Sequence, residues 1–178
     1  MKSIKIIAQE IRISFNQIFS ELFLDFSKFT KDFLFLVVIA IGFLIRLVYL
    51  SQPIKGDETA TFLSYIEPIN PFRVFVYTYT NNHVLHTIFV KISTIFFGNT
   101  LFALRLPSFI ASIAIIYFAY AICKRFKQNG IFGAIALSTW PYLIAYANNS
   151  RGYSLYCLLS LLLVYIYLIA RSNLDNYR

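Results

Sequence analysis

The sequence predicts an all-α integral membrane protein with about four transmembrane helices. Three observations predict this class. Hydrophobic residues make up 58% of the chain and aromatic residues 19%. Charged residues make up only 13%, whereas ordinary soluble domains carry about 25%. Four nearly uncharged runs each approach the length that crosses a bilayer.

The first 31 residues predict an amphipathic helix. Apolar residues recur there at spacings of three and four, which places them on one helix face. They are Ile4, Ile7, Ile11, Phe15, Ile18, Leu22, Phe26 and Phe29. Because five lysine and arginine residues lie in the same segment, we expect it to rest on the cytoplasmic membrane surface as residues 1–31. A helix that binds a partner protein is the alternative.

The four predicted spans follow this helix. Eighteen helical residues rise about 27 Å, close to the hydrocarbon thickness of a bilayer. Pro107 is expected in the first turn of the second span, where proline is tolerated, and Pro141 is expected to kink the third span. The spans are predicted at residues 33–50, 106–123, 130–147 and 152–170.

The basic residues predict the orientation. Ten of the sixteen lysine and arginine residues fall on the side of the N-terminus, which the positive-inside rule assigns to the cytoplasm. The loop 51–105 is then outside, and residues 172–178 form a cytoplasmic tail. We expect a multi-pass protein of the bacterial cytoplasmic membrane, with its active face periplasmic or extracellular. Cys123 and Cys157 fall near opposite faces, which argues against a disulfide.

The outer loop contains two further helical segments. A short helix is predicted from Thr59 to Ile66, ended by Glu67-Pro68. A second, from Val84 to Gly98, is too short for a full span and is predicted to be juxtamembrane. A fifth crossing would place Lys124–Lys127 outside and break the charge rule.

Two adjacent carboxylates stand out in this loop. Asp57 and Glu58 follow Gly56 directly after the first span, and the whole chain has only eight acidic residues. A carboxylate pair just outside a membrane span suggests chemistry on a membrane-borne substrate. The alternative is that Asp57 caps a helix that begins near Thr59.

Other polar residues are expected at the same face. Each has a simpler interpretation: Arg46 could extend to the interface, His83 could be an ordinary loop histidine, and Arg105 and Arg151 could anchor helix ends. The features that converge are Arg46, Asp57-Glu58, Asn82-His83, Arg105-Leu106-Pro107-Ser108 and Arg151-Gly152-Tyr153.

Taken in this order, these motifs resemble the start of the GT-C membrane glycosyltransferases. The nearest group is the superfamily of protein O-mannosyltransferases and aminoarabinose transferases, which includes RgtA/B/C/D-like enzymes. The resemblance covers about residues 33–171 and implies a partial GT-C fold. Members usually have several hundred residues and about eleven or more helices, so we expect this chain to be the N-terminal part of an enzyme and inactive by itself.

The resemblance implies an inverting transfer of a sugar from a polyprenyl-phosphate donor to a lipid, glycan or protein acceptor. Asp57 matches the catalytic aspartate of the family, and Glu58 is expected to support it. The expected substrate-binding residues are Arg46, Asn82, His83, Arg105, Arg151 and Tyr153. Arg46 is also a candidate for stabilising the charged form of Asp57. No metal is assigned, although Asp57, Glu58 and His83 could hold a divalent cation.

Other functional classes remain as alternatives. The chain could be a non-catalytic membrane protein that binds a lipid-linked sugar, a partner subunit, or a plain four-helix scaffold. Nucleic acid is not an expected partner, because the net charge of +8 is explained by cytoplasmic flanks and no aromatic–basic binding motif is present.

Overall fold

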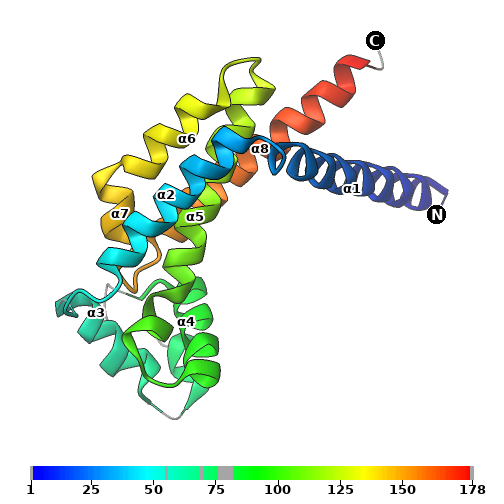
Figure 1. The fold of residues 1–178 in the computed structure, drawn as a ribbon. Coiled ribbons are helices and arrows are strands. Elements are labelled where there is room, and N and C mark those ends of the chain that lie inside the picture. Colours follow the sequence, from blue (N-terminus) through cyan, green and yellow to red (C-terminus); the bar gives the residue numbers. More distant parts are fainter. Residues whose placement is uncertain (1, 55, 69, 76–81, 177–178) are drawn as a thin grey trace.

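The computed structural model describes residues 2–54, 56–68, 70–75 and 82–176, and every element within these ranges is helical. The prediction of an all-α protein is therefore confirmed (Figure 1). The elements are α1 (Lys2–Phe29), α2 (Phe33–Tyr49), α3 (Gly56–Thr61), the π-helix η1 (Phe62–Ile66), the 3₁₀-helix η2 (Pro71–Phe75), α4 (Val84–Phe97), α5 (Leu101–Arg125), α6 (Gly130–Thr139), α7 (Pro141–Ala147) and α8 (Tyr153–Asn176).

Two helices, α5 and α8, are each long and apolar enough to cross a membrane alone. Two bent pairs reach that length only together: α6 with α7, bent by 63°, and the end of α1 with α2, bent by 91°. The described residues therefore supply two to four candidate spans. The bend between α6 and α7 falls at Pro141, as the sequence predicts.

Several helices extend beyond the predicted spans. Helix α5 begins at Leu101 rather than 106, because the Thr100 side chain accepts a hydrogen bond from the Ala103 N–H and caps the helix. Arg105 is therefore inside α5, and Pro107 is beyond its first turn. The predicted span begins just after the charged residue Arg105. The helix itself includes Arg105, because Glu58 pairs with its charge.

Two other elements are longer than predicted. Helix α3 begins at Gly56, so Asp57 lies within the helix instead of capping one near Thr59. Helix α8 continues to Asn176 and includes most of the predicted tail. Helix α4, with 14 residues, is shorter than a span, as expected, and ends before Gly98, which has a φ of 69°.

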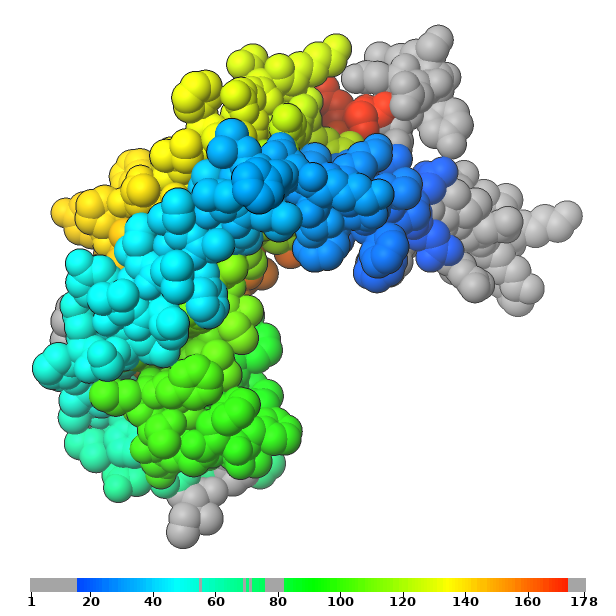
Figure 2. Space-filling model, in the orientation of Figure 1, coloured from blue at the N-terminus to red at the C-terminus, as the bar shows by residue number. Residues whose placement is uncertain are grey.

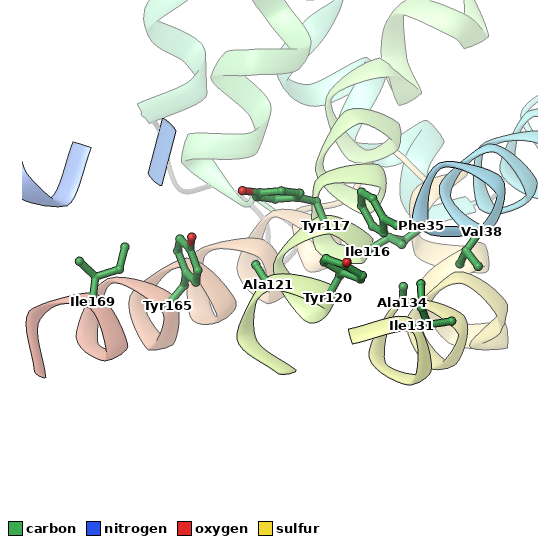
Figure 3. Packing of buried hydrophobic residues seen from close by; sticks show 10 residues of the cluster. All are labelled: Phe35, Val38, Ile116, Tyr117, Tyr120, Ala121, Ile131, Ala134, Tyr165 and Ile169. Atoms are coloured by element: carbon green, nitrogen blue, oxygen red, sulfur yellow. The ribbon is translucent and has the colours of Figure 1, made fainter. Parts of the chain in front are cut away.

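Helix α5 is the centre of the bundle. It packs against α2, α4, α6, α7 and α8, so it is buried on several faces and its apolar residues surround the helix instead of forming one stripe. Side chains from α2, α5, α6 and α8 meet in the main core (Figure 3). The core residues are Phe35, Val38, Ile116, Tyr117, Tyr120, Ala121, Ile131, Ala134, Tyr165 and Ile169.

The amphipathic helix α1 presents apolar residues on two sides. Ile18, Leu22 and Phe29 pack against the main core, and the Phe29 ring meets the Tyr120 ring edge-on at 5.0 Å. Phe19, by contrast, is 65% exposed. Since α1 is nearly perpendicular to α2, its exposed apolar side would suit the surface of a bilayer that α2 enters.

The bundle has two distinct ends (Figure 1). Helices α3 and α4 lie at the end that carries Asp57, which we call the Asp57 end. The final turns of α1, α5 and α8 lie toward the opposite end, which we call the Lys124 end.

Candidate active site

A buried ion pair organises the Asp57 end. The Arg105 guanidinium donates to both carboxylate oxygens of Glu58, with Nε–Oε1 at 2.9 Å and Nη2–Oε2 at 2.7 Å. Both side chains are 1% exposed. The Ser150 N–H donates to Glu58 Oε1 at 2.9 Å, so the same carboxylate also holds the turn between α7 and α8.

The remaining donors of Arg105 hold the segment that leaves α2. They reach the carbonyl oxygens of Leu50 and Gln52, each at 2.7 Å, and of Pro53 at 3.3 Å. All five N–H groups of the guanidinium therefore have protein acceptors. In this structure the polar groups of Arg105 and Glu58 are buried and fix the loops around the site, and their expected roles toward a substrate stay predictions.

The neighbouring ion pair is accessible. Arg151 Nη1 donates to Asp57 Oδ2 at 2.7 Å, and the Asp57 side chain is 57% exposed. The Arg151 guanidinium also lies over the Tyr153 ring, 4.9 Å from its centroid. The structure therefore brings three predicted site residues together: Asp57 from α3, Arg151 from the turn before α8, and Tyr153 from the first turn of α8.

His83 lies beside this pair. Its ring meets the rings of Tyr153 and Tyr156 edge-on, with centroids 5.3 and 5.5 Å apart. Burial, and then the charge of Arg151, lower the pKa of His83. A Cβ on Gly152 would lie 2.9 Å from the His83 Cβ, so only glycine permits this close approach.

The Asn82 side chain connects two elements of the fold. Its side chain is buried; Nδ2 donates to the Val74 carbonyl at 2.7 Å, and Oδ1 accepts from the Thr87 hydroxyl at 3.1 Å. It thereby ties the start of α4 to η2. The predicted contact of Asn82 with an acceptor would have to replace these bonds.

His86, which the sequence reasoning missed, completes the site wall. His86 Nε2 lies 2.8 Å from Ser108 Oγ, and Ser108 donates to the Arg151 carbonyl at 3.0 Å. Because the hydroxyl proton is used in that bond, Nε2 is the donor to Ser108. Burial, with a smaller effect of His83, lowers the pKa of His86 to about 4. Its spacing of three from His83 on one helix was the available signal.

Several buried polar atoms near the turn after α7 find no hydrogen-bond partner within the described part of the chain. Buried polar atoms without a protein partner often bind water, so this turn keeps unused hydrogen-bonding capacity inside the protein. They are His83 Nε2, Asn148 Oδ1, Asn149 Oδ1, Ser150 Oγ and Ser154 Oγ.

Arg46 is fully buried between α2, α5 and α6. Its guanidinium donates to the carbonyl oxygens of Leu137 at 3.0 Å and Ser138 at 2.9 Å, and to Ser112 Oγ at 2.6 Å. The Leu137 carbonyl needs this donor because Pro141, four residues later, has no N–H. The expected pairing of Arg46 with Asp57 is therefore wrong: Arg151 occupies that position, and Arg46 caps the broken helix.

No group of three or more His, Cys, Asp or Glu side chains that could hold a metal ion occurs among the residues described. Glu58 is committed to Arg105 and Ser150. A divalent cation held by Asp57, Glu58 and His83 stays a prediction. Cys123 and Cys157 are both free, as expected.

An apolar groove adjoins the site. It has a volume of about 360 Å³ and lies between α4, α5 and α8. His86 forms part of its lining and links it to Ser108 and Arg151. A charged, exposed pair thus lies close to a groove that suits a hydrocarbon chain.

Residues 81–177, more than half of the chain, match the family described as dolichyl-phosphate-mannose-protein mannosyltransferase. The chain belongs to this family. This mannosyltransferase-like chain is accordingly a multi-pass membrane protein of the GT-C glycosyltransferase type, as its motifs predict. Neither a curated protein nor a solved structure matches it.

The matched region of this mannosyltransferase-family chain includes Asn82, His83, Arg105, Arg151 and Tyr153. It begins after Asp57 and Glu58. The link between the acidic loop and the matched region therefore comes from the structure, through the ion pairs of Asp57 with Arg151 and of Glu58 with Arg105.

Proposed function

We propose that this chain forms the catalytic end of a glycosyltransferase that moves a sugar from a polyprenyl-phosphate donor to an acceptor hydroxyl at the outer face of the membrane. The accessible Asp57–Arg151 pair carries this proposal, because it combines an exposed carboxylate with a cation 2.7 Å away. The outward orientation of the Asp57 end rests on the distribution of basic residues; a bacterial cytoplasmic membrane is part of the proposal.

The proposed reaction is a single displacement at the anomeric carbon. The acceptor oxygen attacks that carbon while its bond to the phosphate oxygen breaks, and the configuration inverts. Asp57 takes the proton of the acceptor hydroxyl as general base. Arg151 stabilises the negative charge of the departing polyprenyl phosphate, for which a guanidinium with several N–H donors is well suited.

The surrounding groups fit the two halves of such a donor. The apolar groove between α4, α5 and α8 would hold the polyprenyl chain. The sugar would lie against the rings of Tyr153 and His83, beside the Asp57–Arg151 pair. In this proposal Glu58, Arg105 and Asn82 position the loops, and Arg46 supports α6, without touching substrate.

The test is transfer activity of the complete gene product in membranes, measured with a radiolabelled polyprenyl-phosphate sugar. Asp57→Asn keeps the shape of the side chain and removes its basicity, so the rate should fall by about 10²–10⁴-fold. Glu67→Gln, which removes an exposed carboxylate near the same loop, is the matched control and should stay near the parent rate.

Near-normal turnover of the Asp57→Asn enzyme would remove the general-base role. Retained donor binding without any transfer in the parent protein would favour the alternative, a membrane protein that binds a lipid-linked sugar without catalysis.

A further inference from the structure

A second pocket lies at the Lys124 end, opposite the candidate active site. It has a volume of about 700 Å³ and lies between the last turns of α1, the turn after α5, and α8 near Arg171. In Figure 2 the red end of α8 adjoins the yellow-green turn after α5. The basic residues of its lining are Lys28, Lys124, Arg125, Lys127 and Arg171.

The lining of this pocket is strongly basic, although two acidic residues beside it, Glu21 and Asp32, interact with Arg125 and Lys124 respectively. Asp25 is the acidic residue of the lining, and it is already bound by the Arg125 guanidinium and by the Tyr165 hydroxyl, the latter at 2.7 Å. Five cations and one carboxylate leave a formal charge of +4. Among the described residues, the ion pairs involve none of the other four cations.

One of these basic residues, Lys127, has an unusual backbone conformation. Lys127 has a φ of 59°, and the bonds Gln128 N–H to Cys123 O and Lys127 N–H to Lys124 O, both 2.9 Å, form the turn that ends α5. Glycine normally occupies this position because a side chain there is strained. The helix dipole accounts for Lys124 and Arg125 in the last turn of α5 but not for a lysine beyond it. A residue other than glycine in this conformation is uncommon.

The pocket also lies at a suitable depth. Helix α1 makes an angle of 91° with α2, so a bilayer that α2 enters would have α1 along its surface. Lipid phosphates lie at that level, and apolar side chains such as Phe23 of α1 and Leu163 of α8, 66% and 69% exposed, adjoin the acyl region.

We propose that this pocket binds the phosphate group of an anionic phospholipid, with Lys124, Lys127 and Arg171 as the contacting cations. Clustered lysine and arginine side chains between helices at a membrane surface recognise lipid phosphates. This site is separate from the Asp57 end, and the proposal does not depend on the proposed function.

The test measures lipid binding to the full 178-residue chain in dodecyl maltoside, with native mass spectrometry as the readout. Dioleoylphosphatidylglycerol should bind at least tenfold more tightly than dioleoylphosphatidylcholine. Lys124→Gln/Arg171→Gln should weaken phosphatidylglycerol binding at least tenfold and leave phosphatidylcholine unchanged. Lys31→Gln/Arg73→Gln removes the same charge from exposed residues outside the pocket and should change binding by less than threefold.

Equal weakening by both double variants would show a general charge effect and overturn the proposal. Displacement of the lipid by millimolar inorganic phosphate would identify a free-phosphate site and overturn the lipid assignment, whereas no displacement supports it. Lys124→Arg/Arg171→Lys keeps the charge and should retain binding, which separates loss of the site from loss of folding. A loss of binding in this variant would also overturn the proposal.

Discussion

Glu58→Gln should destabilise the fold strongly, and the sign of its effect should reverse when Arg105 is removed. In the parent, Glu58 gives two oxygens to the Arg105 guanidinium and accepts from the Ser150 N–H. Glutamine retains one oxygen but turns an NH₂ group toward Arg105 Nη2. That contact becomes donor against donor, and the buried guanidinium loses its counter-charge.

The expected loss of unfolding free energy follows from the burial of the ion pair. One buried donor without an acceptor costs about 1–3 kcal/mol, and removal of one partner of a buried ion pair typically costs about 3–5 kcal/mol in total. Because both side chains are 1% exposed, water cannot replace the lost partner, and we expect a loss of about 3–5 kcal/mol for Glu58→Gln. In an Arg105→Met background the carboxylate is itself the unpaired charge, so Glu58→Gln should stabilise the protein.

The assay is unfolding by sodium dodecyl sulfate in dodecyl maltoside micelles, followed by the fluorescence of Trp140, the single tryptophan. Glu21→Gln is the matched control: Glu21 also pairs with an arginine, at 3.1 Å, but is 41% exposed, so the change should be below about 1 kcal/mol. Equal effects of Glu58→Gln in the two backgrounds would refute the assigned ion pair.

Three further predictions use the same unfolding assay. Arg46→Leu leaves the carbonyls of Leu137 and Ser138 without this donor and should lower the free energy of unfolding by about 2–6 kcal/mol. The loss should be smaller in a Pro141→Ala background, because residue 141 then regains an N–H. An equal loss in both backgrounds would contradict the capping role. Gly152→Ala should cost about 1–3 kcal/mol because its Cβ would meet His83 at 2.9 Å, and an unchanged midpoint would contradict this packing. The contribution of His86 to the free energy of unfolding should be constant above about pH 6.5 and fall toward pH 4, because only the unfolded state protonates His86 in that window. His86→Gln should reduce the dependence of the unfolding free energy on pH between these values.

The sequence by itself determined the fold class and most elements. Hydropathy and the three-to-four spacing are local properties, and they predicted α1, α2, α4 and α8 and the bend at Pro141. The order of short motifs also predicted the family, which the match over residues 81–177 confirms. The N-terminal boundary of α5 was missed, because a charge inside an apolar helix looks like a helix end until its partner is known.

The roles of the polar residues were decided only by tertiary structure. Composition and spacing identified five arginine and acidic side chains for one face, but they could not show that four of them form an accessible pair and a buried pair while Arg46 caps α6. Arg105 and Glu58 are 47 positions apart, and Arg151 and Asp57 are 94 apart, so the packing of α3 against α5 and the turn before α8 sets the pairing. Burial then separates the pairs physically: Glu58, at 1% exposure, is shielded from water by the loops that it holds, whereas Asp57 is 57% exposed.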